Sequence, residues 1–284
     1  MSPSTMTTYK QFATFSNDTA GLERLFRFLQ SCVQIILAYP SATSTICQLS
    51  HLFQCTGKLP TFLTRSVLLA LQQRLDVARR YIRVFRFLAV FQQAQQLLMS
   101  REHAIVSSLH PKDATNPPSA DRKVERSSTP PSAPHSPRQP GKAEEWLDCL
   151  GLTLTGVYLL TESSTIIDYM QIDGLQVWGP ERYLVINAEA QRFWFLALLC
   201  GVLSALLKIW RILTTSGEYA SRGRPETLIK LVRGAVTNTA DMVLPGVIIG
   251  WLDVSPGVVA LVMCATTLST SVDIWERCGR EIPG

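Results

Sequence analysis

The clearest pattern in the chain combines apolar and basic positions at helical spacing around the segment Leu71–Phe91, LQQRLDVARRYIRVFRFLAVF. On a helix, one stripe collects the apolar side chains of Val67, Leu71, Leu75, Ala78, Ile82, Phe85 and Ala89. The opposite face collects Arg65, Gln72, Asp76, Arg79, Arg83 and Arg86. Arg80 lies at the border, and Arg74 lies toward the apolar stripe. The pattern predicts an amphipathic helix that begins after Pro60 and carries an arginine face.

Two shorter amphipathic patterns precede this helix. The first begins at Asp18 or Thr19, which suit an N-cap, and ends before Pro40. Its apolar residues recur at spacings of three and four, at Leu22, Leu25, Phe26, Leu29, Val33, Ile36 and Leu37. The second opens at Ser41 to Ser44 and runs to the break at Gly57. Both patterns predict helices.

A proline-rich stretch, Ser107–Lys142, separates these patterns from the rest of the chain. It contains eight of the sixteen prolines and almost no large apolar residue. Because such a segment buries too little surface to offset the entropy of ordering, it predicts a disordered linker. Its Ser-Pro and Thr-Pro pairs also suit a phosphorylated or partner-binding segment, and a plain spacer is the favoured interpretation.

Beyond the linker the apolar content rises. A moderately apolar helix is predicted from about Trp146, with an interruption at Glu162. The segment Phe193–Leu207 has fifteen uncharged residues and extends to Leu213 if Lys208 and Arg211 reach an interface. The segment Val254–Val272 has nineteen uncharged residues. Both predict membrane-spanning helices, with a buried helix of a soluble protein as the alternative.

Proline and glycine interrupt the chain between these two apolar segments. A single straight helix is not expected here, because this stretch contains Pro245, Gly246 and Gly250. A bent or re-entrant hairpin is predicted instead. Gly250 and Gly257 offer sites for close helix approach, although their spacing is not that of a G-x-x-x-G motif.

Strand patterns are few and short, so the sequence predicts an all-α integral membrane protein. Three regions are expected: an N-terminal amphipathic helical region over residues 1–106, a disordered linker over 107–142, and a membrane-embedded helical region over 143–284. Nearly half of the 284 residues are hydrophobic, which is high for a water-soluble protein. The seven widely spaced cysteines predict reduced thiols. The first ten residues predict no secretory signal, and the sequence does not end in S-K-L.

Charge is distributed unevenly and changes how the arginine helix is interpreted. Of the net charge of +5, residues 1–106 contribute 11 basic and 4 acidic side chains. Three interpretations compete. The first is an ordinary surface helix, and the second is a nucleic-acid element, which no recognisable module supports. The third is a helix in the plane of a bilayer, with its stripe at the acyl boundary and its arginines on anionic headgroups. The membrane interpretation is preferred, and no nucleic-acid partner is predicted.

Several segments of the sequence resemble the peroxisomal biogenesis factor 11 family. They are GLERLFRFLQ, ARRYIRVFRFL, RFWFLALLCGVLSAL and NTADMVLPGVIIGWLDVSPGVVALVMCATTLSTSVDIWE. The last contains Asn238, Asp241, Pro245, Gly250 and Gly257, which match the family's C-terminal signature.

The resemblance implies a self-associating protein of the peroxisomal membrane that promotes membrane elongation before a dynamin-type GTPase cuts the organelle. The implied partners are an anionic lipid bilayer, further copies of this chain or of the family, and the fission machinery. Lipid contact is expected at Arg65, Leu71, Arg74, Leu75, Arg79, Arg80, Ile82, Arg83, Phe85 and Arg86.

Catalytic motifs give no support for an enzyme, and no cofactor or metal site is predicted. The alternative function is a pore for small metabolites. Its polar lining would come from Thr153, Thr155, Glu162, Thr266 and Thr267. The segment Lys208–Asp241 has a positive excess that places it in the cytosol by the positive-inside rule. The family resemblance implies instead that both termini lie there, so the topology stays open.

Overall fold

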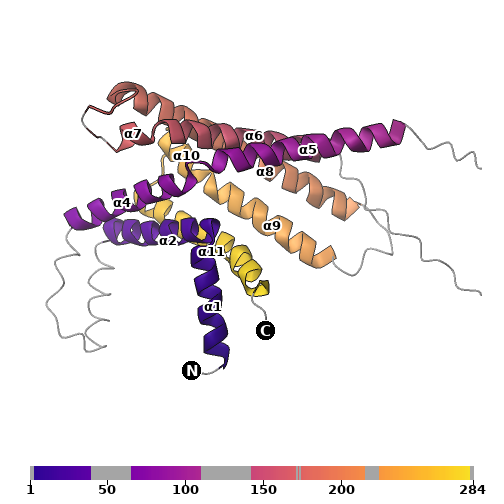
Figure 1. Ribbon diagram of the computed structural model, residues 1–284, viewed down its shortest axis with the longest axis horizontal. Helices are drawn as coiled ribbons and strands as arrows, with labels where there is room; N and C mark the ends of the chain where they lie inside the picture. Colours follow the sequence, from indigo (N-terminus) through magenta and orange to yellow (C-terminus); the bar gives the residue numbers. More distant parts are fainter. Residues whose placement is uncertain are drawn as a thin grey trace, which may run out of the picture.

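The computed structural model describes residues 3–39, 65–109, 142–170, 172, 174–214 and 224–281. Every regular element in these ranges is a helix, as the sequence predicted (Figure 1). The predicted helix over residues 41–57 lies outside the described residues, and so does nearly all of the predicted linker over 107–142. The helices on either side extend into the predicted linker, because α5 ends at Leu109 and α6 begins at Lys142.

The N-terminal region begins with α1 (Pro3–Asn17) and α2 (Thr19–Ala38). The sequence predicted α2, with Asp18 or Thr19 at its N-cap, and predicted no helix at α1; Asp18 occupies the N-cap position. The missed helix lacks an apolar repeat of its own and is held by tertiary contacts. The buried Phe15 ring lies 5.8 Å from that of Trp275, and the Gln11 side-chain amide donates to the Trp275 carbonyl at 2.9 Å.

The predicted arginine helix is two helices, α4 (Arg65–Arg83) and α5 (Arg86–Leu109). A turn at Val84 and Phe85 separates them, with the Leu88 amide donating to the Phe85 carbonyl at 3.2 Å. Four of the five residues Tyr81–Phe85 are β-branched or aromatic, and such residues have modest helix propensity. The prediction of one continuous helix is therefore wrong at this point, and α5 leaves α4 in a new direction (Figure 1).

The C-terminal region contains α6 (Lys142–Ser164), α7 (Ile166–Tyr169), α8 (Pro180–Thr214), α9 (Arg224–Asp241), α10 (Val243–Ile248) and α11 (Pro256–Arg280). The helix predicted from Trp146 corresponds to α6, which continues past Glu162 by only two residues. The segment Phe193–Leu207 lies within α8, and Val254–Val272 lies within α11 except for its first two residues.

The helices form two groups that contact each other. In one, α5 packs on α6, α6 on α8, and α8 on α9. In the other, α2 packs on both α4 and α11, and α1 packs against α2 and α11 (Figure 1). Contacts between α4 and α6 and between α9 and α11 connect the groups. Helices distant in sequence therefore surround α4, which is the element that carries the arginines.

The chain bends between α9 and α11 at the predicted place. Asp241 ends α9, the short α10 contains Pro245, and Gly250 has a φ of +77°, a left-handed conformation that glycine adopts without strain. Gly250 therefore serves the turn and not a close helix approach. Gly257 does allow a close approach, since a Cβ there would lie 2.7 Å from the Tyr39 ring.

Two helices, α8 and α11, are long and apolar enough to cross a membrane by length and composition. Only 22% of the most apolar window of α8 and 28% of that of α11 are buried within the chain. The core helix of a soluble protein would be mostly buried, so the low burial is consistent with membrane association. The five described cysteines are free, and Cys149, Cys200 and Cys278 among them are buried.

Candidate functional site

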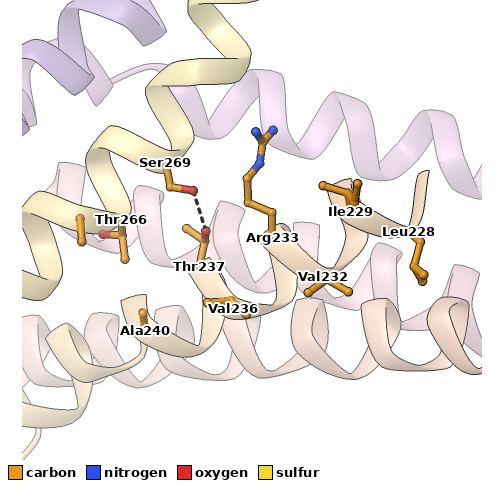
Figure 2. Close-up of a pocket in the computed structure, with 10 residues that line it drawn as sticks. Leu228, Ile229, Val232, Arg233, Val236, Thr237, Ala240, Thr266 and Ser269 are labelled. Atoms are coloured by element: carbon orange, nitrogen blue, oxygen red, sulfur yellow. Dashed lines mark hydrogen bonds between the residues drawn. The ribbon is translucent and has the colours of Figure 1, made fainter. Parts of the chain in front are cut away.

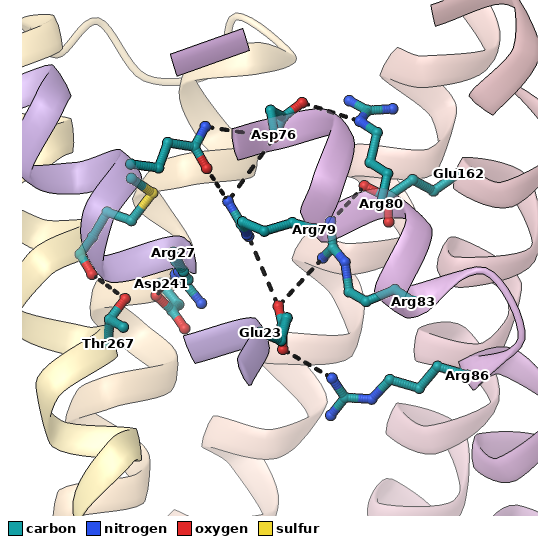
Figure 3. Close-up of polar contacts among 12 residues, drawn as sticks. Glu23, Arg27, Asp76, Arg79, Arg80, Arg83, Arg86, Glu162, Asp241 and Thr267 are labelled. Carbon is teal, nitrogen blue, oxygen red and sulfur yellow. Dashed lines mark hydrogen bonds and ion pairs between the residues drawn. The ribbon is translucent and has the colours of Figure 1, made fainter. Parts of the chain in front are cut away.

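The arginines of α4 point into the protein. Arg79, Arg80 and Arg83 are each less than one tenth exposed, and the three form ion pairs with carboxylates from three helices (Figure 3). The sequence analysis expected these guanidinium groups at the surface, on lipid headgroups. In the folded chain they are out of reach of a headgroup, because buried acids of the chain itself satisfy them.

Glu23 of α2 lies at the centre of the cluster. Its Oε2 accepts from Nη1 of Arg86 at 3.0 Å, and its Oε1 is 3.9 Å from guanidinium nitrogens of both Arg79 and Arg83. Burial raises the pKa of Glu23, but the nearby guanidinium groups of Arg83, Arg24, Arg79 and Arg86 outweigh it and lower the pKa to about 2. Glu23 is therefore ionised over the whole physiological pH range.

Glu162 of α6 is the strongest partner of Arg83. Its Oε1 accepts from Nη2 of Arg83 at 3.0 Å and from the Tyr158 hydroxyl at 3.2 Å. Burial lowers the pKa of Arg83, but Glu162, Tyr158, Glu23 and Asp76 together raise it by more, so the net shift is upward. The ion pair of Arg83 with Glu162 fixes the C-terminal end of α4 to the C-terminal end of α6.

Asp76 and Gln30 accept hydrogen bonds from the other two buried arginines of α4, Arg80 and Arg79. Oδ2 of Asp76 accepts from Nε of Arg80 at 3.1 Å, and the Arg80 guanidinium lies 4.0 Å from the centre of the Tyr169 ring, a cation–π distance. Nη1 of Arg79 donates to the side-chain oxygen of Gln30. Burial, followed by repulsion from Arg83 and Arg27, lowers the pKa of Arg79 to about 10, so it remains charged at neutral pH.

A separate pair links α2 to α9. Nη2 of Arg27 lies 2.6 Å from Oδ1 of Asp241, and both side chains are nearly buried. Asp241 belongs to the C-terminal signature, so its position in the structure explains what that acid does. It neutralises a guanidinium from the N-terminal region. We call the whole set the arginine network: Glu23, Arg27, Asp76, Arg79, Arg80, Arg83, Arg86, Glu162 and Asp241 (Figure 3).

The arginine network has more donors than acceptors. Its five arginines face four carboxylates, and four buried guanidinium N–H groups have no acceptor among the described residues, at Nε of Arg27, Arg79 and Arg83 and Nη1 of Arg80. Buried donors without partners are costly. Losing any one of the four carboxylates would therefore increase the excess of buried positive charge.

The opposite face of α4 is apolar and exposed. Val67, Leu71 and Tyr81 are between 43% and 52% exposed, and Phe85 in the turn after α4 is 74% exposed. The predicted stripe is divided, because Leu75 packs in the core against Val33 and Leu68. Ile82 is half-buried.

The expected lipid-contact residues therefore fall into two sets. Leu75, Arg79, Arg80 and Arg83 are buried, whereas Arg65, Leu71, Arg74, Phe85 and Arg86 are exposed. Lipid contact remains a prediction for the exposed set. An arrangement with charges inside and large apolar side chains outside suits a lipid environment better than water.

Sequence reasoning did not identify the acidic partners of the arginines. Glu23 shares the polar face of α2 with Arg27 and Gln30, Glu162 was considered only as an interruption and as a pore-lining residue, and Asp241 was noted only within the C-terminal signature. Glu23 is the one acid of the mostly apolar α2, and such an acid is the signal that could have indicated a buried pair. Among the described residues, no group of three or more His, Cys, Asp or Glu side chains could hold a metal ion.

Comparison with known families was decisive for the C-terminal half. Residues 139–275 match the model of the family described as peroxisomal biogenesis factor 11 (PEX11). This match supports assignment of the chain to the PEX11 family. The matched region covers most of α6 to α11 and includes Glu162 and Asp241 of the arginine network. It does not include α1 to α5, whose resemblance to the family rests on the residues quoted above. No curated protein and no solved structure matched the chain.

Membership in the PEX11 family indicates a role in peroxisome biogenesis and proliferation. PEX11 is a family of biogenesis factors and not a family of enzymes. The two apolar helices, α8 and α11, are consistent with association of this PEX11 protein with a membrane.

Proposed function

We propose that the protein elongates the peroxisomal membrane before fission by inserting the exposed apolar face of α4 into one leaflet. The observation that carries this proposal is the orientation of α4. Arg79, Arg80 and Arg83 are paired with acids inside the protein, while the side chains of Leu71, Tyr81 and Phe85 are exposed. An apolar helical face flanked by positive charge is the feature that binds bilayer interfaces.

The physical effect of such insertion is curvature. A helix embedded at the level of the headgroups widens one leaflet and not the other. The membrane therefore curves, with the expanded leaflet on its convex side. The exposed Arg65 and Arg74 add electrostatic attraction to anionic lipid, at about 1 kcal/mol each. In this proposal the arginine network is a structural anchor, because it fixes α4 to α2 and α6 with its apolar face outward.

Membrane integration through α8 and α11 completes the proposal. The two helices would hold the protein in the peroxisomal membrane, and α4 would act on the bilayer beside them. Self-association would concentrate the inserted helices, and a dynamin-type GTPase would then cut the elongated membrane. The protein is proposed to act without catalytic activity of its own.

The polar residues suggested for a channel have other roles in the fold. Glu162 is paired with Arg83, and the hydroxyls of Thr266 and Thr267 both donate to the Met263 carbonyl within α11. The hydroxyls of Thr153 and Thr155 likewise donate to carbonyls of their own helix. These contacts favour the membrane-remodelling proposal over the pore.

The proposal can be tested with the full-length protein in vesicles that contain anionic lipid. We expect the double variant Leu71→Glu, Phe85→Glu to resist alkaline carbonate extraction like the parent chain but to lose vesicle tubulation, because the charges oppose burial of the α4 face. Leu98→Glu, an exposed leucine on α5, is the matched control and should tubulate normally. Normal tubulation by the double variant would contradict the proposed role of α4.

A further inference from the structure

An apolar groove of about 490 Å³ runs between α9 and α11 (Figure 2). Ile229, Val232 and Val236 line it from α9, and Ala265 and Thr266 line it from α11. Ile229 and Val236 are each more than 60% exposed, so this surface has no cover within the described residues. No acid of the arginine network lines the groove, and the groove has no part in the proposed action of α4.

The polar groups in the groove are already satisfied within the chain. The hydroxyls of Thr237 and Ser269 share a hydrogen bond of 3.2 Å across the groove, and the Thr266 hydroxyl donates to the Met263 carbonyl at 3.3 Å (Figure 2). An occupant therefore meets hydrocarbon and needs no hydrogen-bonding groups of its own. A purely apolar chain fits this lining.

The charged side chains at the groove belong to the N-terminal half of α9 and to its partner on α11. Arg233 of α9 lines the groove and pairs with Asp273 of α11, and Lys230 is exposed one turn before Arg233. The opposite end, around Ala240, is lined by small uncharged residues. From Lys230 to Ala240, α9 rises about 15 Å, which is close to half of the roughly 30 Å hydrocarbon core of a bilayer. The groove thus has the length and charge profile of one leaflet.

We propose that this groove binds an acyl chain of a phospholipid, with the headgroup phosphate beside Lys230 and Arg233. The inference rests on the membrane insertion of α11 proposed above. A lipid chain fits better than a helix from a second copy. The Thr237–Ser269 bond and the Arg233–Asp273 pair hold α9 against α11 along the groove. The groove therefore does not open to admit a helix, which with its side chains is about 10 Å across.

The test uses the full-length protein in phosphatidylcholine vesicles that contain a phosphatidylcholine with a photoactivatable acyl chain. Irradiation followed by peptide mass spectrometry should place the lipid adduct on α9 and α11 at the groove. Val236→Trp, which fills the groove, should remove most of this adduct. Val258→Trp, an exposed valine of α11 outside the groove, is the matched control and should keep it. An adduct that Val236→Trp leaves unchanged would overturn the proposal.

A second measurement identifies the occupant from the protein side. With the photoreactive amino acid p-benzoylphenylalanine at position 229, in place of Ile229, we expect a product heavier by one lipid. A product of twice the protein mass would show that a second copy covers the groove and would overturn the proposal. Carbonate extraction of the same vesicles separates the two hypotheses. Release of the protein contradicts membrane insertion itself, whereas a retained protein without a groove adduct contradicts only the lipid site.

Discussion

The two halves of α4 place the same residue type in opposite environments. In the first half, Arg65 and Arg74 are exposed beside exposed valine and leucine side chains. In the second half, Arg79, Arg80 and Arg83 are buried and paired. The intrinsic preference of arginine for the protein surface cannot account for this difference, because the side chains are identical. Carboxylates from α2 and α6 lie within reach of the second half, and these acids decide which arginines turn inward.

The comparison also separates two roles within one helix. Burying a charge without a partner costs several kcal/mol, so paired arginines fix the helix in place, whereas exposed arginines add about 1 kcal/mol each to attraction by an anionic surface. The arginines of the second half are therefore suited to anchor the helix, and those of the first half are suited to attract anionic lipid. Substitutions in the two halves should have different consequences.

The largest effect is expected from removing an acid of the anchoring half. Glu162→Leu leaves the guanidinium of Arg83 buried without its closest carboxylate, and we expect a loss of about 3–5 kcal/mol of folding free energy. Thermal unfolding of the full-length protein in detergent, followed by circular dichroism, measures this. The matched control is Glu189→Leu, which removes an exposed acid paired with Arg192 and should change stability by less than about 1 kcal/mol. Equal effects of the two variants would contradict the anchoring role.

A smaller effect on stability is expected from lowering the pH. Because the pKa of Glu23 in the folded chain, about 2, is below its ordinary value of 4.5, ionised Glu23 stabilises the fold above pH 4.5. That stabilisation is lost as the pH falls from 4.5 toward 2. We expect the unfolding midpoint to decrease over this interval, and to decrease less in Glu23→Gln, which has lost the titrating group.

The Gln variant separates Glu23 from other carboxyl groups that titrate in acid. The difference between the parent chain and Glu23→Gln should be largest above pH 4.5 and should shrink toward pH 2. A difference that stays constant over the whole range would show that ionised Glu23 does not stabilise the network.

Sequence alone predicted α2, an amphipathic helix at α4, the helix from Trp146, the two apolar segments and the bend, because each depends on local signals; it predicted no helix at α1 or α9. The spacing of Leu71, Leu75 and Ile82 defines a helix, and Pro245 with Gly250 defines a break. The inward orientation of the arginines was not predictable in the same way. Periodicity defines two faces but does not say which is buried, and that choice depends on Glu162, which is 79 positions from its partner Arg83.

The division of the apolar stripe could not be predicted from the sequence for a related reason. Leu75 and Leu71 are one helical turn apart and chemically identical, yet only Leu75 contacts Val33 and Leu68 in the core. The turn after Arg83 then moves Phe85 off the line of α4. The burial of Leu75 depends on where α2 lies, and the pattern of α4 contains no information about that helix.

The smallest expected effect, and the sharpest contrast between the two halves, comes from single arginine substitutions. Arg74→Gln removes an exposed charge, so we expect unchanged thermal stability and binding to anionic vesicles that is weaker by about 1 kcal/mol, roughly fivefold. The contribution should shrink with added salt, because exposed charges are screened. Arg79→Gln should behave in the opposite way. It should reduce stability, because Glu23 and Asp76 lose a buried partner, while leaving vesicle binding of the folded fraction nearly unchanged. Vesicle co-sedimentation at two salt concentrations, beside thermal unfolding, measures both quantities for each variant. If Arg79→Gln weakened vesicle binding as much as Arg74→Gln without loss of stability, the buried arginines would have to reach the lipid, and the division of α4 into an anchoring and a membrane-facing half would be wrong.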